Sequence, residues 1–248
     1  MISCKSPREI ALMKEAGKIV MLVFERMKSL CVPGISTLKL DIEALKVMKE
    51  NGAESGSKGY EGYPGAICIS VNDTLLHGIP SEKIILHEGD IVSFDVVVKK
   101  NGYYADATRT YAVGRVSENA QRLMEVTEAS FFEALKVVKS GVRVGDISSA
   151  IQLFVESHGY SLPVEFTGHG IGHQMHEDPN VPNTGKAGSG PMLREGVCIA
   201  IEPMVAEGKK DIYILKDGWT VKMRDKKLSC HYENTVAVTK DGYELITM

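Results

Sequence analysis

Hydrophobic residues near the N-terminus recur at spacings of three and four, the period of an α-helix with one buried face. Ser6 followed by Pro7 is a typical helix start, and Glu9 stands where a capping box places its carboxylate. Pro33-Gly34 then stops the helix. The buried face is predicted to comprise Leu12, Ala16, Ile19, Val23, Met27 and Leu30.

The same pattern of a longer helix followed by a shorter one is predicted twice along the chain. A second helix is predicted over about 38–50, and a later pair is predicted as a helix from about Glu118 to Lys139 and a shorter helix that ends near Gly159. Aligned without a gap, 34–52 matches 141–159 at both end glycines. This repeat signal is weak, and two copies at this level also arise by chance.

Strand-like sequence follows each helix pair. Residues 91–98 and 103–113 are rich in β-branched and apolar residues, and Asn101-Gly102 between them is typical of a type I′ hairpin turn. The pattern predicts an α+β fold, in which two helix-pair-plus-sheet halves pack together and the helices cover one face of a curved antiparallel sheet. Further strands are predicted at Val197–Ile201, Ile212–Leu215 and Thr235–Val238.

Composition narrows the class of protein. The 248 residues are 44% hydrophobic and 25% charged, with a formal net charge of -3, so no general basic field for nucleic acid is expected. No apolar run approaches the roughly 20 residues that span a bilayer, and the N-terminus lacks the apolar core of a secretory signal. Five cysteines stand singly, without metal or redox spacing. A cytoplasmic protein with reduced thiols is expected.

Asp95 and Asp106 are the most informative acidic pair. Asp95 interrupts an apolar strand, where an unpaired buried carboxylate is costly. With Asn101-Gly102 as a two-residue turn, Asp95 lies opposite Thr108, and Asp106 is a diagonal neighbour on the same face. Both carboxylates can then reach one ion. Separate pairing with a cation such as Arg109 is an equally weighted alternative at this point.

Two further carboxylates stand at strand ends. Glu202 follows the apolar run 197–201, and Glu233 precedes 235–238. Each alone is a common strand-end charge. Four such carboxylates gathered from separate parts of the chain would need cations between them, because hard oxygen donors repel one another without them.

Histidines cluster in the glycine-rich stretch 168–176. His169 and His176 bracket it, and its glycines allow the backbone to approach a site closely. His173, between them, is interpreted as a surface residue. His77, taken alone, is interpreted as a packed loop histidine.

With these residues in place, the chain resembles the type I methionine aminopeptidases over nearly its whole length. The resemblance implies the pita-bread fold, with two pseudo-symmetric αβ halves of about 1–115 and 116–248 in one catalytic domain, 1–248. The motifs that carry it are Asn72–Pro80, Gly168–Gly172, Ile201–Met204 and Lys216–Val221, together with Asp95, Asp106 and Glu233.

The resemblance also implies a dinuclear metal centre. Asp106 and Glu233 would bridge two divalent ions, Asp95 would bind one, and His169 and Glu202 would bind the other. The ions could be Fe(II), Mn(II), Co(II) or Zn(II), because mixed oxygen and nitrogen ligands discriminate poorly among them. A metal-activated water would hydrolyse the first peptide bond and remove the initiator methionine when the second residue is small.

Catalytic and pocket roles follow from the same resemblance. Glu202 would shuttle the proton, His176 would contact the carbonyl oxygen, and His77 would contact the scissile amide nitrogen. Met175, Leu76 and Asn234 depart from the usual family residues, which bears on pocket shape and on tuning of the ligands. The substrate-binding residues would be Tyr60, Tyr63, Cys68, His77, Met175, His176 and Trp219.

The expected partners are N-termini of nascent polypeptides, at the ribosome, and the expected state is a monomer that binds neither membrane nor nucleic acid directly. One rival is a related dinuclear peptidase of the prolidase or aminopeptidase P type, although those proteins usually carry an additional N-terminal domain that is not evident here. The other is a pita-bread protein that binds peptides without catalysis, against which the complete set of ligands and histidines argues.

Overall fold

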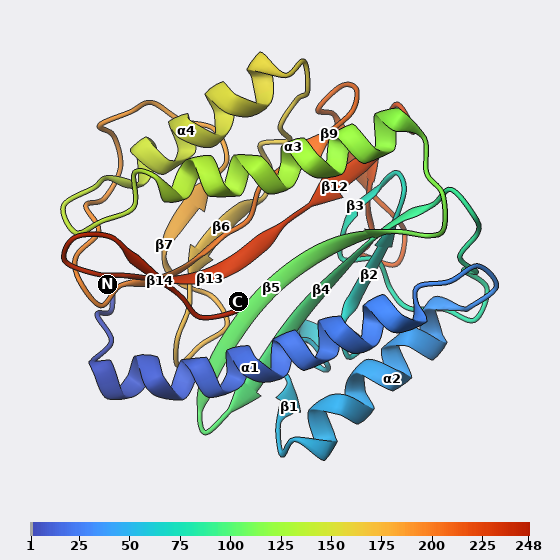
Figure 1. Ribbon diagram of the computed structural model, residues 1–248, viewed down its shortest axis with the longest axis horizontal. Helices are drawn as coiled ribbons and strands as arrows, with labels where there is room; N and C mark the ends of the chain where they lie inside the picture. The colour runs from blue at the N-terminus through green and yellow to red at the C-terminus, as the bar shows by residue number, and fades with distance from the viewer. Residues whose placement is uncertain (1) are drawn as a thin grey trace.

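Two pairs of helices lie against one curved sheet in the computed structural model, which describes residues 2–248 (Figure 1). The first pair packs on the hairpin strands of the N-terminal half, and the second pair covers the strands of the C-terminal half. The helix pairs predicted from the sequence are confirmed. Their bounds are α1 Pro7–Leu30, α2 Thr37–Glu50, α3 Glu118–Leu135 and α4 Val144–Ser157.

Local capping explains where the helices begin and end. The Ser6 side chain accepts a hydrogen bond from the Glu9 amide, and the Glu9 carboxylate accepts one from the Ser6 amide at 2.8 Å, so the predicted capping box is present. α3 ends at Leu135, short of the predicted Lys139. Residues 136–138 instead donate to carbonyls three residues back, a tightened final turn that closes the helix early.

Nine of the strands in the described residues form the main sheet, with the order β1-β4-β5-β13-β8-β6-β7 and with β2 and β14 pairing at β4 and β13. The remaining strands form a three-stranded sheet, β10-β11-β3, and a two-stranded sheet, β12-β9. Neighbouring strands are antiparallel throughout. The strands of the N-terminal half are β1 Glu54–Ser55, β2 Cys68–Val71, β3 Thr74–Leu76, β4 Ile91–Lys100 and β5 Tyr103–Ala112. Those of the C-terminal half are β6 Thr167–Gly170, β7 Glu177–Pro182, β8 Cys198–Ile201, β9 Met204–Ala206, β10 Ile212–Ile214, β11 Val221–Met223, β12 Ser229–His231, β13 Glu233–Val238 and β14 Tyr243–Leu245.

The β4–β5 hairpin has the register that its turn predicts. Asn101 and Gly102 both have positive φ, 51° and 82°, as a type I′ turn requires, and Asp95 lies opposite Thr108. Side chains alternate between the two faces along the strand, so Val92, Phe94 and Val96 all pack in the helix-covered core. Asp95 therefore faces the other side of the sheet.

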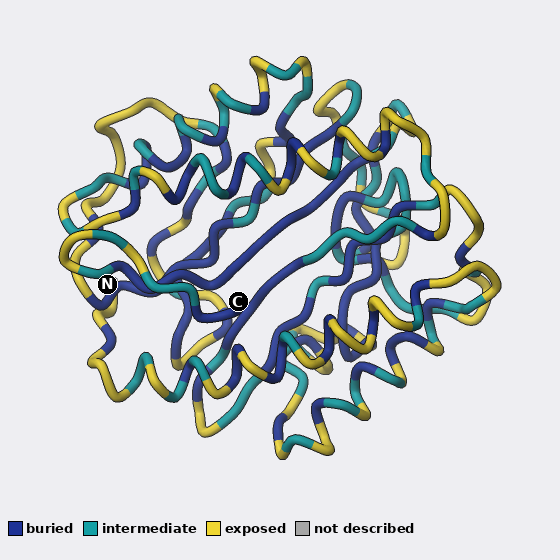
Figure 2. Tube along the Cα trace, viewed as in Figure 1, coloured by how far each residue is buried: buried dark blue, intermediate teal, exposed yellow. Residues whose placement is uncertain are grey.

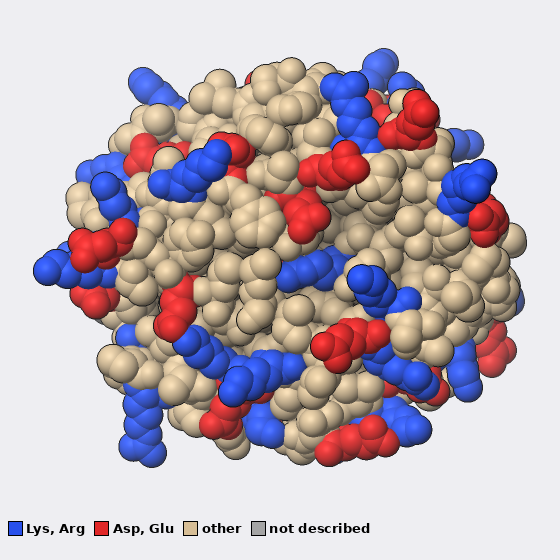
Figure 3. All heavy atoms as spheres, in the orientation of Figure 1, with Lys and Arg blue, Asp and Glu red and all other residues tan. Residues whose placement is uncertain are grey.

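The interior is divided into two main apolar clusters, one under each helix pair. Figure 2 shows the central strands as an almost continuously buried band between the helix pairs. Acidic and basic side chains are interspersed over the helical face in Figure 3, as the near-neutral charge leads one to expect. Among residues 2–248, no helix combines the length and apolarity needed to cross a bilayer.

The end of the chain packs beneath α1. Gly17, in the middle of that helix, has no room for a side chain, because a Cβ there would lie 2.0 Å from the carbonyl oxygen of Ile246. Glycine has a poor helical propensity, but at this position it allows the C-terminal segment to pack closely against the helix.

Candidate metal centre and adjoining cavity

Five adjacent strands of the main sheet each bring one predicted ligand to the face opposite the helices. In sheet order, β4 carries Asp95, β5 carries Asp106, β13 carries Glu233, β8 is followed by Glu202, and β6 carries His169. The pairing of Glu233 with Thr108 on β5 joins the two halves of the sheet at the middle of this row. Residues that are up to 138 positions apart thus meet at one place.

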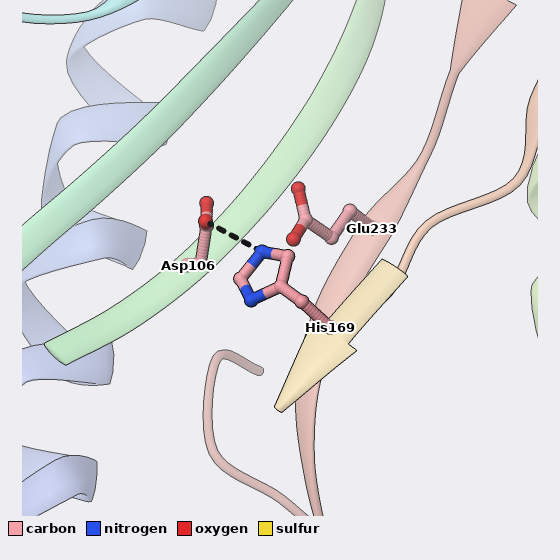
Figure 4. A group of neighbouring side chains, drawn as sticks. All are labelled: Asp106, His169 and Glu233. Carbon is pink, nitrogen blue, oxygen red and sulfur yellow. Dashed lines mark ion pairs between the residues drawn. The ribbon is translucent and has the colours of Figure 1, made fainter. Parts of the chain in front are cut away.

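Figure 4 shows Asp106, His169 and Glu233 converging from three strands. His169 Nε2 lies 3.7 Å from Asp106 Oδ2 and 3.8 Å from Glu202 Oε1. Both distances exceed those of a hydrogen bond. One donor atom each from Asp106, His169 and Glu233 lies within 4.8 Å of the others, so the three residues could hold a metal ion between them.

Carboxylate oxygens in the cluster lack protein partners. Oδ1 of Asp95, Oδ1 of Asp106 and Oε1 of Glu233 are buried without a hydrogen bond. Burial, together with repulsion from Asp106 and Glu202, raises the pKa of Asp95 and of Glu233 well above the usual range. Buried, unpartnered anions of this kind fit divalent cations, and the mixed carboxylate and imidazole donors suit a transition metal.

Arg109 does not neutralise these carboxylates, which excludes the alternative of separate ion pairs with it. Its guanidinium donates to the backbone carbonyls of Thr108 and Glu233, at 2.9 and 2.6 Å, and to Asn234 Oδ1 at 2.7 Å. It also donates to the carbonyl of Thr247. Arg109 therefore fixes the backbone that carries Glu233 and leaves its carboxylate available.

The rings that flank Arg109 and the hydroxyl beside Glu233 complete this support. The guanidinium lies over the aromatic rings of Phe24 and Tyr232, 5.1 and 4.4 Å from their centroids. Thr108 donates its hydroxyl to Glu233 Oε2 at 2.9 Å. The orientation of Glu233 is set before any cation binds.

A cavity of about 340 Å³ opens beside the five donors. Its apolar wall is formed by Tyr63, Cys68, Met175 and Trp219, with the Tyr63 and Trp219 rings edge to face at 5.2 Å. Tyr63 donates its hydroxyl to the carbonyl of Gly78 at 2.8 Å, so this wall is tied to the loop that carries His77. The structure thus places all the predicted pocket residues around one space: Tyr60, Tyr63, Cys68, His77, Met175, His176 and Trp219.

Two histidines line that space. His176 packs edge to face against the His169 ring at 4.3 Å, and its Nδ1 hydrogen-bonds the Tyr60 hydroxyl at 2.8 Å. His77 lies edge to face against Phe166 and Trp219. Burial lowers the pKa of His77 to about 4, and the nearby imidazoles add to the effect, so this ring is neutral near pH 7.

His173 lies outside the cavity, as its interpretation as a surface residue anticipates. Its side chain is 58% exposed, and its Nε2 lies 3.2 Å from Glu9 Oε1. The ring stacks on Tyr103 at 4.3 Å. This histidine joins α1 to the loop and takes no part in the donor cluster.

Sequence reasoning missed His231, Phe166 and Thr167. Phe166 and Thr167 line the cavity immediately before the glycine-rich stretch, and no pattern distinguished them. His231 is 3% exposed and lies 3.4 Å from Glu202 Oε2. It precedes Glu233 by two positions, so strand periodicity, which puts such residues on one face, could have found it.

Comparisons with known proteins agree with this geometry. Residues 11–240 match the model of metallopeptidase family M24. Methionine aminopeptidase 1 of Bacillus subtilis is 45% identical over 247 residues, covering 100% of this chain and 99% of the relative. The crystal structure of methionine aminopeptidase from Rickettsia prowazekii superposes with a TM-score of 0.98 at 38% identity and covers both chains fully.

A more distant solved structure shows the shared fold. Prolidase from Pyrococcus furiosus matches with a TM-score of 0.79 at 24% identity, and the alignment covers 99% of this chain but 65% of the prolidase. The expected pita-bread fold is therefore confirmed. The chain belongs to metallopeptidase family M24 and, within it, to the methionine aminopeptidases.

Proposed function

We propose that this protein hydrolyses the first peptide bond of new polypeptides and releases the initiator methionine, at a pair of divalent ions held by the row of five donors. The observation that carries the proposal is the convergence of Asp95, Asp106, His169, Glu202 and Glu233, with buried oxygens that no protein group satisfies, beside a cavity with one apolar wall. Kinship to methionine aminopeptidases over the full chain supports the substrate.

Divalent ions bound by these donors would lower the pKa of a water and polarise the scissile carbonyl. Glu202 is suited to accept and pass on the proton of that water, because its side chain is 12% exposed and borders the cavity. Asp106 and Glu233 sit between the outer donors in sheet order, which supports a bridging role for both.

His176 and His77 would act on the peptide bond itself. When the Tyr60 hydroxyl donates to Nδ1 of His176, Nε2 of that ring carries the proton and can donate to the carbonyl oxygen. His77 is a neutral imidazole near pH 7 and can hydrogen-bond the scissile nitrogen.

The apolar wall would receive the methionine side chain. Tyr63, Cys68, Met175 and Trp219 surround a volume suited to a flexible thioether, and the polarizable sulfur packs well against aromatic edges. A small second residue in the substrate is expected, because its side chain would lie next to the crowded donors and rings. A more open groove that shares Phe166, Thr167 and His176 with the cavity would carry the rest of the polypeptide.

The cellular setting follows from this activity. We place the protein in the cytoplasm, where it would act as a monomeric single domain, residues 1–248, on N-termini that emerge from the ribosome. Nucleic acid and membrane are not direct partners in this proposal. The bound ions would be Fe(II), Mn(II), Co(II) or Zn(II).

Cleavage of Met-Ala-Ser tests the proposal. Protein supplied with Mn(II) or Co(II) should release methionine, chelator should stop it, and Met-Ile-Ser should be cleaved far more slowly. His176→Gln should lower kcat, while His87→Gln, a change at an exposed histidine outside both the cavity and the groove, should not. Faster cleavage before Ile than before Ala would contradict the expected preference for a small second residue. Selective cleavage of Xaa-Pro dipeptides would favour the prolidase alternative instead.

A further inference from the structure

His231 is a buried histidine aimed at the donor cluster, although it is outside the set of five ligands. It ends β12, its side chain is 3% exposed, and its Nε2 is inaccessible and has no hydrogen-bond partner. Its backbone is fixed on both sides by Thr110, whose hydroxyl accepts from the His231 amide and donates to the His231 carbonyl. The direction of the ring is therefore set by the sheet.

The ring points at two carboxylates of the cluster. Nε2 lies 3.4 Å from Glu202 Oε2 and 3.9 Å from Glu233 Oε2. Both contacts are longer than the 2.7–3.2 Å or so expected of a hydrogen bond, so neither carboxylate satisfies the nitrogen. An unsatisfied polar atom at this depth requires another partner.

The distances match those between ligands of one ion. Donor atoms that share an ion at about 2.1 Å lie roughly 3.0–4.0 Å apart when they subtend about 90–140°. His169 Nε2 lies 3.7 and 3.8 Å from its two carboxylate neighbours, within the same range. One atom each of Glu202, His231 and Glu233 lies within 4.8 Å of the others, a second triad that shares Glu233 with the first.

Glu202 is thus placed between two imidazoles, with Oε1 toward His169 and Oε2 toward His231. We propose that His231 is a sixth ligand of the metal centre, which binds on the Glu202 side and adds a second imidazole nitrogen to the centre. This inference rests on the proposed function, since it concerns the same ions. A second nitrogen shifts the preference of that site toward Zn(II) and Co(II) and away from Mn(II), which favours oxygen donors.

The test compares metal binding in three proteins. Wild type, His231→Gln and His173→Gln are titrated with Zn(II) and with Mn(II) by calorimetry, without substrate. His231→Gln should weaken Zn(II) binding about tenfold or more and change Mn(II) binding much less, while the exposed control His173→Gln changes neither. Gln retains a hydrogen-bond donor for Glu202, so unchanged Zn(II) affinity in His231→Gln would reduce His231 to a packing residue and overturn the proposal.

A crystal structure of the Zn(II)-loaded wild type gives an answer that needs no variant. Nε2 of His231 within about 2.4 Å of an anomalous zinc peak supports the proposal, and a separation beyond about 3 Å from every peak refutes it. Failure of the wild type to bind any divalent ion would overturn the proposed function as well. A wild type that binds two ions and cleaves Met-Ala-Ser, with His231 remote from both, would overturn this inference alone.

Discussion

Replacing Glu233 by Gln should stabilise the metal-free protein and destabilise the metal-loaded one. Carboxylate oxygens of Asp106 and of Glu202 lie within 4.8 Å of Glu233 donors. Ionised pairs at that distance repel by about 3.5 kcal/mol or more at an effective dielectric constant of 20. In the wild type, proton uptake relieves part of this repulsion, so we expect the substitution to raise the free energy of unfolding of the metal-free protein by about 1–3 kcal/mol. Each kcal/mol corresponds to about 2–4 °C in Tm for a chain of this size.

The same substitution should remove the stabilisation that metal binding gives to the folded protein. At a hundred times Kd, binding stabilises wild type by about 2.7 kcal/mol, and the variant should lose most of that. Gln can still accept the hydrogen bond from Thr108, so local packing is retained. Thermal melts with chelator and with Mn(II) measure both effects, and Glu82→Gln, an exposed change, is the control. Equal destabilisation of Glu233→Gln in both conditions would refute the reasoning that repulsion is relieved by cations.

Three further outcomes are expected. Tyr60→Phe removes the hydroxyl that bonds His176 Nδ1, so kcat should fall about 2- to 10-fold with little change in KM; an unchanged kcat would show that Tyr60 does not orient that ring. Gly78→Ala puts a Cβ 2.2 Å from the Ile69 carbonyl oxygen and should cost about 1–3 kcal/mol in melts; a neutral effect would contradict the tight packing. Hydrogen bonds from Ser6 lower the pKa of Glu9 to about 2 from 4.5, so its stabilisation is complete above pH 4.5 and is lost as pH falls toward 2. Glu9→Gln should therefore destabilise at pH 7 but not near pH 2 in chemical denaturation; a pH-independent difference would be inconsistent with this linkage.

Local rules predicted the parts of the fold that depend on neighbouring residues. The Ser6 cap and the Asn101-Gly102 turn each act within a few residues, and the turn alone placed Asp95 opposite Thr108. The end of α3 was predicted too late, because the turn that closes it uses backbone bonds that no residue type signals.

Long-range pairing was beyond such rules. The insertion of β13 between β5 and β8 decides which carboxylates meet, and it depends on how two halves of the chain pack. The site residues were therefore assigned through family resemblance and not from spacing. The contact between Tyr60 and His176 spans 116 positions, so it was not readable from the sequence.

The contacts that hold Glu233 in place include Thr247, which is synthesised after all five donors. Arg109 holds both the Glu233 backbone and the Thr247 carbonyl, and the Thr247 hydroxyl donates to Asn234 beside them. An emerging chain has made its first four donors before Thr247 leaves the ribosome. The fifth cannot be locked in place until Thr247 has folded against Arg109, so hydrolytic competence should arise only after that step.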